Sequence, residues 1–323
     1  MSRLAALIAI VFALCAAPAW GASGAAVGGD AGPFGVTADG IGVRYVAQSV
    51  QGGTLLEAID RDGGAILRSH FFHEHLMVPA VAFDGSATGL AADGLSLVLA
   101  SPVRRSSSRF TVIDTRTLRV RHTFTLPGLF ALDAISPDGG RLYLIELLSP
   151  DGTRYAVRAY DMASGRLLSQ PVVDPSEADE PMRGSPISRV MSTDGRWAYT
   201  LYDGGGKAPF IHALDTVRAQ AKCIDLDSLA GRQDLMDMRL GLDGGGAVLV
   251  QEGATHAILR VDPRTFAVSR VRPAAPPAPV AAGGTGWLEP TIGFALLALL
   301  AAGAVWAGRR RRESPVDLGQ LRL

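Results

Sequence analysis

Apolar stretches alternate with short polar turns along the middle of the chain, and two aspartates mark each repeat of this pattern. An Asp-Gly pair follows an apolar-rich stretch five times, beginning at Asp39, Asp93, Asp138, Asp194 and Asp243. A second aspartate closes a later apolar stretch five times, at Asp60, Asp114, Asp161, Asp215 and Asp262. The two series are separated by 21, 21, 23, 21 and 19 residues. Turns placed by chance would not keep this spacing, so the pattern indicates an internal repeat.

The third unit, residues 130–173, shows the pattern most completely. Its apolar runs predict a strand, an Asp-Gly hairpin, a second strand, a loop, a third strand, a turn at Ala163-Ser164-Gly165 and a fourth strand. Four antiparallel strands in a unit of about 45 to 55 residues are typical of a β-propeller blade.

The repeat therefore predicts an all-β fold, a β-propeller of five or six four-stranded blades over residues 30–271. One sheet with two apolar faces cannot cover itself, whereas a radial arrangement lets each face pack against the next blade. A β-sandwich is the alternative for short strands, but it does not explain five units with fixed spacing. Residues 76–84 lie outside the repeat, as an extra strand or as part of a degenerate sixth blade.

One unit carries a recognisable signature. Ser136-Pro137-Asp138-Gly139 followed by Leu142-Tyr143, and later Tyr160-Asp161 with Ser164-Gly165, resembles the repeat of the bacterial YVTN and WD40-like β-propellers. The resemblance covers residues 34–271 and is sharp only in the third unit. It implies an extracytoplasmic propeller, and because members of this superfamily bind, scaffold or catalyse, it does not assign a function.

The N-terminus predicts a secretory signal peptide over residues 1–21. Arg3 precedes an apolar run at 4–14, which is too short to span a bilayer comfortably, and small residues follow it. Cleavage fits after Ala19 or Gly21. An uncleaved anchor is the alternative, and lipidation of Cys15 fits badly because Phe12-Ala13-Leu14 is a poor lipobox.

The C-terminus predicts a membrane anchor. Residues 272–286 are a Pro/Ala/Gly linker, and an uncharged stretch at 291–308 follows it within a predicted transmembrane helix over 287–308. The four arginines at 309–312 open a basic tail, 309–323, which the positive-inside rule places in the cytoplasm. The expected location is the cell membrane, crossed once, with the propeller outside.

Composition narrows the function. Of the 323 residues, 48% are hydrophobic and 19% charged, and the net charge is zero, which excludes a disordered chain and argues against a nucleic-acid partner. Two cysteines exclude a disulfide-rich scaffold, and after cleavage of the signal peptide only Cys223 remains. We expect Cys223 to be a small buried apolar side chain, with a reactive thiol as the alternative.

Candidate metal ligands cluster at His70, His73 and His75, beside Glu74. Imidazole and carboxylate suit zinc or copper, although no established metal motif has this spacing. The alternative is a polar loop between blades with solvated histidines. No other cofactor is predicted. The acidic run Glu177, Asp179 and Glu180 lacks a calcium-loop pattern and is interpreted as a solvated surface loop.

Four charged residues fall on the predicted innermost strands and so face the central channel: Asp133, Arg189, Asp237 and Arg239. Converging carboxylates there could hydrolyse a glycoside, whereas mixed signs favour internal ion pairs that close the channel. We therefore expect a membrane-anchored binding module whose partner is an envelope protein or a glycan. The alternative is a lactonase-like or glycosidase-like hydrolase acting at the propeller funnel.

Overall fold

The computed structural model describes residues 29–272, except positions 39, 104–106, 150, 151, 153 and 181. These residues belong to the compact unit 1–272, which is separate from a second unit at 273–323. Strands joined by turns and by single-turn 3-10 helices make up the described residues, which contain no α-helix. The predicted all-β class is confirmed.

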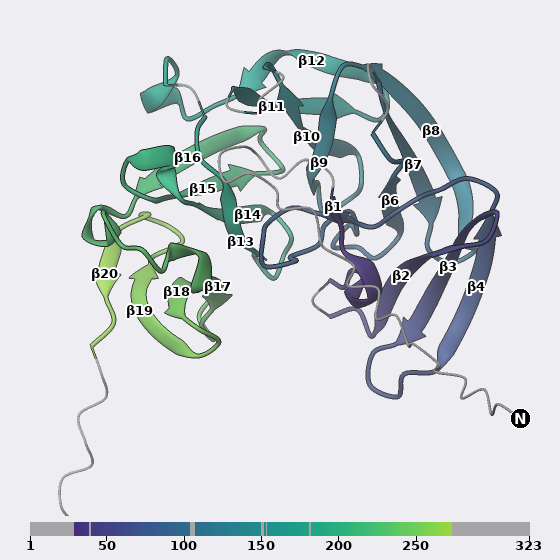
Figure 1. The fold of residues 1–323 in the computed structure, drawn as a ribbon, viewed down its shortest axis with the longest axis horizontal. Coiled ribbons are helices and arrows are strands. Elements are labelled where there is room, and N and C mark those ends of the chain that lie inside the picture. The colour runs from purple at the N-terminus through teal and green to yellow at the C-terminus, as the bar shows by residue number, and fades with distance from the viewer. Residues whose placement is uncertain are drawn as a thin grey trace, which may run out of the picture. The chain divides into compact units, whose positions relative to one another are not determined.

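Five antiparallel meanders follow one another along the chain, as Figure 1 shows. The first contains β2 (Val43–Val50), β3 (Gly53–Asp60) and β4 (Ile66–Phe72). The second contains β6 (Ser96–Ala100), β7 (Ser107–Asp114) and β8 (Arg119–Pro127). The third contains β9 (Phe130–Ile135), β10 (Arg141–Leu147), β11 (Tyr155–Asp161) and β12 (Arg166–Val172). The fourth contains β13 (Pro186–Met191), β14 (Trp197–Tyr202), β15 (Phe210–Asp215) and β16 (Gln220–Asp225). The fifth contains β17 (Met238–Leu242), β18 (Val248–Glu252), β19 (His256–Val261) and β20 (Val268–Arg270).

The first two blades have a shortened innermost strand. Val36 bridges Tyr45 of β2, and Leu90 bridges Leu97 of β6, so the fourth strand is reduced to one residue pair in each. Gly35 and Gly89 stand directly before these bridges at φ values of 59° and 110°. A backbone in the left-handed region cannot continue an extended strand, which limits pairing to the single bridge.

The repeated aspartates are turn residues. At the Asp138-Gly139 hairpin, Asp138 Oδ1 accepts hydrogen bonds from Gly140 N at 2.9 Å and Ser136 Oγ at 2.6 Å, and Gly139 has a φ of 71°. At the end of β11, Asp161 Oδ1 accepts hydrogen bonds from Ser164 N and Ser164 Oγ, both at 2.7 Å. The same local chemistry recurs in each blade, which explains why both aspartate series keep their spacing.

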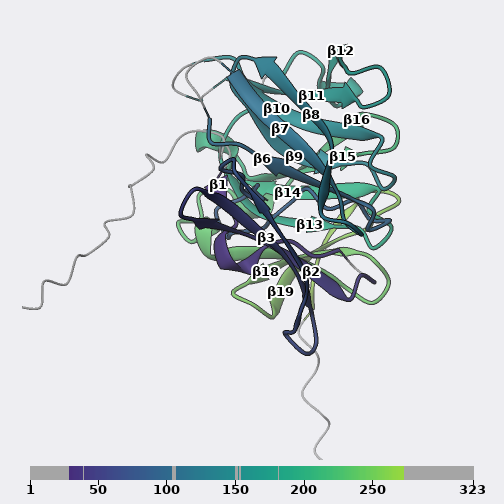
Figure 2. The ribbon, with the colours of Figure 1, turned by 90° about the vertical axis from the view of Figure 1, so that its right-hand side faces the viewer.

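Each blade packs against the next through buried side chains. Blades 1 and 2 share a core, as do blades 2 and 3, blades 3 and 4, and blades 4 and 5. Phe124 of β8 and Tyr160 of β11, for example, stack with ring centroids 4.1 Å apart. This is the face-to-face burial that the repeat predicts for a β-propeller, and Figure 2 shows the successive sheets from the side.

Residues 76–84 form an extra strand, the first of the two alternatives. β5 (Pro79–Ala80) pairs with β1 (Gly29–Asp30), and Met77 bridges Ala100. Further along, Phe83 N and Asp84 N donate hydrogen bonds to Pro186 O at 3.0 Å and Ile187 O at 3.1 Å. The segment thus reaches the innermost strand of blade 4 and forms no blade of its own.

The predicted signal peptide 1–21, the transmembrane helix 287–308, the basic tail 309–323 and the linker beyond Arg272 lie outside the described residues. Within the described part of the chain, the helices are short turns, and none has the length and apolar character needed to cross a bilayer.

Candidate functional site

Asp133 and Arg189 pair at the centre of the propeller. Asp133 lies on β9 and Arg189 on β13, and their side chains are only 2% and 3% exposed. The Arg189 guanidinium contacts Asp133 Oδ1, donates to Asp133 O at 2.7 Å, and donates through Nε to Thr200 Oγ1 at 2.6 Å. A buried guanidinium needs such partners for its N–H groups. The internal pairing that mixed charges suggested is therefore present.

The other two channel candidates do not join this pair. Asp237 is exposed at the end of the 3-10 helix η5 (Leu235–Asp237). Arg239 on β17 donates hydrogen bonds to the carbonyls of Met236 and Met238, and its Nε lies 3.9 Å from Asp84 Oδ2. Among the described residues, neither Asp237 nor Arg239 bonds with Asp133 or Arg189. No pair of free carboxylates therefore assembles around Asp133.

The three histidines form no ligand set either. His70 packs edge-on against Phe72, with ring centroids 4.7 Å apart, and His73 packs edge-on against Phe71 at 5.0 Å. The strand β4 ends at Phe72, so His73 and His75 lie beyond it and are exposed. The ring nitrogens of the three histidines do not meet in the described structure, and metal binding by them stays a prediction.

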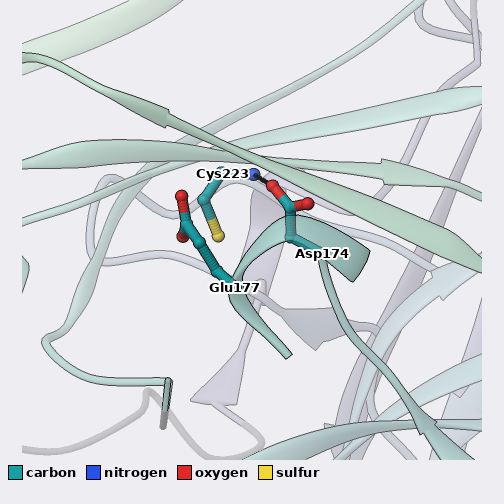
Figure 3. Close-up of side chains that lie close together, drawn as sticks. All are labelled: Asp174, Glu177 and Cys223. Atoms are coloured by element: carbon teal, nitrogen blue, oxygen red, sulfur yellow. Dashed lines mark hydrogen bonds between the residues drawn. The ribbon is translucent and has the colours of Figure 1, made fainter. Parts of the chain in front are cut away.

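Another group of possible ligands does converge, between blades 3 and 4. Asp174 and Glu177 lie at the start and end of the turn that follows β12, where Asp174 caps the 3-10 helix η2 (Pro175–Glu177). Cys223 lies on β16, the outermost strand of blade 4. One oxygen of each carboxylate and the Cys223 sulfur lie within 4.8 Å of one another. Figure 3 shows Cys223 between the two carboxylates.

Asp174 fixes the geometry of this group. Its Oδ1 accepts hydrogen bonds from Ser176 N at 2.9 Å and Ser176 Oγ at 2.7 Å. Its Oδ2 accepts from Cys223 N at 3.0 Å and pairs with Lys222 Nζ at 2.9 Å. Burial alone would raise the pKa of Asp174, but the hydrogen bonds from Ser176, Lys222 and Cys223 outweigh it and lower the pKa to about 2.

Cys223 is held as a neutral thiol. Burial raises the pKa of Cys223 to about 12, and the negative charges of Glu177 and Asp174 add to this effect. A reactive cysteine needs a lowered pKa, so the structure supports the inert alternative for the free protein.

His212 lies beside Cys223 in the same sheet. The two residues are direct partners across β15 and β16, so their side chains emerge on the same face. His212 is 2% exposed, and burial lowers its pKa to about 4, which keeps the imidazole neutral. Thr200 and Arg189 continue the same row across β14 and β13. A line of polar residues thus crosses blade 4 from the central ion pair to Cys223.

Sequence reasoning missed this site because its parts come from separate segments. Glu177 was expected in a solvated loop and Cys223 in the core, and each expectation considers one segment alone. Their meeting depends on the packing of the loop after blade 3 against the outermost strand of blade 4. The only available signal was the odd cysteine close to a run of acids in the neighbouring repeat.

Comparisons with known proteins assign no family. No protein-family model matches the sequence, and no curated protein matches it significantly. Among solved structures, Kuenenia stuttgartiensis hydrazine synthase aligns at 16% identity over 72% of this chain and 69% of that chain, with a TM-score of 0.40. A prolyl endopeptidase aligns at 13% identity over 79% of this chain and 37% of that chain, with a TM-score of 0.42.

TolB from Acinetobacter baumannii aligns at 16% identity over 71% of this chain and 56% of that chain, with a TM-score of 0.32. Likenesses at this level carry no conclusion about function. The similarity to the YVTN and WD40-like repeats stays a prediction from the sequence.

Proposed function

We propose that this protein is a membrane-anchored, extracytoplasmic β-propeller that acts as a binding module in the cell envelope, with an envelope protein or a glycan as its partner. The observation that favours binding over catalysis is the buried ion pair between Arg189 and Asp133. It occupies the central position where a funnel hydrolase would need a free carboxylate.

The hydrolase alternative requires two groups that the geometry does not supply together. A glycosidase uses a pair of carboxyl groups about 5 to 9.5 Å apart, one of them ready to donate or accept a proton. Asp133 is ion-paired and buried, while Asp237 is exposed and makes no contact with that pair in the described structure. We therefore propose no reaction at the centre.

The sequence supports attachment to a membrane. The apolar stretch 291–308 is long enough for a bilayer, and the arginines at 309–312 favour a cytoplasmic C-terminus. The linker at 272–286 would hold the propeller away from the lipid surface. Rigid blades with variable loops would then present a broad outer surface to a partner.

The test is crosslinking of the full chain in native membranes, followed by titration of the purified captured partner against the purified chain. The proposal predicts saturable binding, and no hydrolysis of a panel of lactones and glycosides. Turnover of any of these substrates that disappears in a folded Asp133→Asn variant would instead establish the hydrolase alternative.

A further inference from the structure

The cavity between blades 3 and 4 carries an excess of negative charge. It has a volume of about 160 Å³, and the acidic residues in its wall are Asp174, Glu177, Glu180 and Asp225. Arg183 pairs with Glu180 at 3.1 Å, and Lys222 pairs with Asp174 at 2.9 Å. Glu177 and Asp225 form no ion pair within the described structure. A cation would therefore be attracted into the cavity.

The donor atoms that meet in this cavity suit a particular class of cation. Cys223 offers sulfur, and Glu177 and Asp174 offer carboxylate oxygens, all within 4.8 Å. Calcium and magnesium prefer oxygen donors alone, whereas zinc and similar metals accept sulfur, nitrogen and oxygen together.

An independent observation comes from His212. Its side chain lines the same cavity, is 2% exposed, and makes no hydrogen bond with any described residue. Buried polar groups normally have a partner, so an imidazole without one in a cavity wall points to a missing ligand. Its register opposite Cys223 places it on the same face of blade 4 as the thiol.

We propose that Cys223, Glu177 and Asp174 bind a divalent metal ion of the zinc class in this cavity, with His212 as the fourth ligand. The nitrogens of His212 lie outside the group of three, so the ring must move towards the cavity to complete a tetrahedral site.

The surroundings of the ligands fit this role. Ser176 donates two hydrogen bonds to Asp174 Oδ1, which would orient the carboxylate as outer partners do in metal sites. Lys222 occupies Asp174 Oδ2 and is 39% exposed, so its flexible side chain can leave towards solvent when the metal arrives. A bound cation would also stabilise the Cys223 thiolate, so binding releases the thiol proton to solvent.

This proposal does not depend on the binding-module function. A failure to capture an envelope partner would leave the metal site untouched, and a failure to bind metal would leave the partner proposal untouched.

The experiment adds Zn²⁺ or Co²⁺ to the full chain purified in detergent, after treatment with a chelator. We expect Zn²⁺ to raise the melting temperature, and Co²⁺ to produce the near-ultraviolet absorption of a thiolate bound to cobalt. Cys223→Ser should abolish that absorption, and Glu177→Gln should weaken affinity at least tenfold. Both variants should melt close to the unmodified protein in chelator, which shows that they fold.

The matched control is the double variant His73→Ala/His75→Ala, which removes the other candidate ligands and should retain full binding. The proposal is overturned if neither metal has an effect, or if the cobalt absorption survives in Cys223→Ser. It is also overturned if the histidine double variant abolishes binding.

Discussion

The backbone amide of Cys223 donates a hydrogen bond to Asp174 Oδ2 at 3.0 Å, which ties the loop after blade 3 to the outermost strand of blade 4. The same carboxylate caps the short helix that carries Glu177. One aspartate thus links two blades and positions the residues around the cavity.

This link makes stability depend on pH through Asp174. Its pKa falls from 3.8 in the unfolded chain to about 2 in the folded protein. The resulting stabilisation is fully present above about pH 5 and is lost as the pH falls towards 2, a change of about 2 kcal/mol. Asp174→Asn should remove this dependence, measured by urea unfolding at several pH values. The control Asp179→Asn changes an exposed residue of the same loop and should keep the dependence.

His212 should produce a second dependence at higher pH. Its pKa falls from 6.5 to about 4 because the charged imidazole is disfavoured in its buried position. The unfolded chain therefore binds a proton first, and stability falls between pH 6.5 and 4 by about 3 kcal/mol. His212→Leu should flatten this range of the unfolding profile. An unchanged slope in that variant, or a slope lost instead in His73→Ala, would contradict the assignment.

The central ion pair should be costly to break and cheap to replace. Arg189→Met leaves Asp133 buried without a partner, so we expect a loss of about 3 to 5 kcal/mol in the free energy of unfolding. The double variant Asp133→Leu/Arg189→Met should recover more than half of that loss, because it buries no charge. Chemical denaturation of both variants checks this. Additive losses would show that the two side chains do not act as a pair.

The Asp-Gly hairpins should require glycine. Gly139 has a φ of 71°, and a Cβ there would lie 2.8 Å from Ser96 Oγ of the neighbouring blade. Gly139→Ala should therefore cost about 1 to 3 kcal/mol. The control Gly42→Ala adds a methyl group where nothing lies within 4 Å and φ is not in the left-handed region, so its effect should stay below about 0.5 kcal/mol. Thermal unfolding of the two variants distinguishes them.

Lys222 should compete with the proposed metal. Its ammonium occupies Asp174 Oδ2, an oxygen that the metal needs. Lys222→Met should thus increase the affinity for Zn²⁺ severalfold, whereas the charge-retaining Lys222→Arg should not. Competition with a chromogenic chelator measures both affinities. A weaker affinity in Lys222→Met would mean that Lys222 supports the site instead of competing for it.

The repeat could be predicted from sequence because its signals are local. Asp138 and Asp161 bond to groups two or three residues away, so the same letters produce the same turns in every blade. The inward position of Asp133 and Arg189 also followed from the strand order. Their pairing was one of two alternatives, because it depends on the distance between neighbouring blades, which sequence spacing does not determine.

The remaining features depend on contacts between segments. The histidines were expected to share a strand, but β4 ends at Phe72, and the aromatic partners of His70 and His73 separate their rings. The site around Cys223 requires the register of β15 with β16 and the docking of the loop after β12. Neither leaves a periodic trace in the sequence.

The measurement that tests the central claim most directly compares the unmodified full chain with the Asp133→Leu/Arg189→Met variant in partner capture from native membranes and in hydrolysis of the lactone and glycoside panel. If the propeller is a binding module, both proteins capture the same partner with similar affinity and neither hydrolyses a substrate. Hydrolysis by the unmodified protein that is absent from the folded double variant would contradict the account.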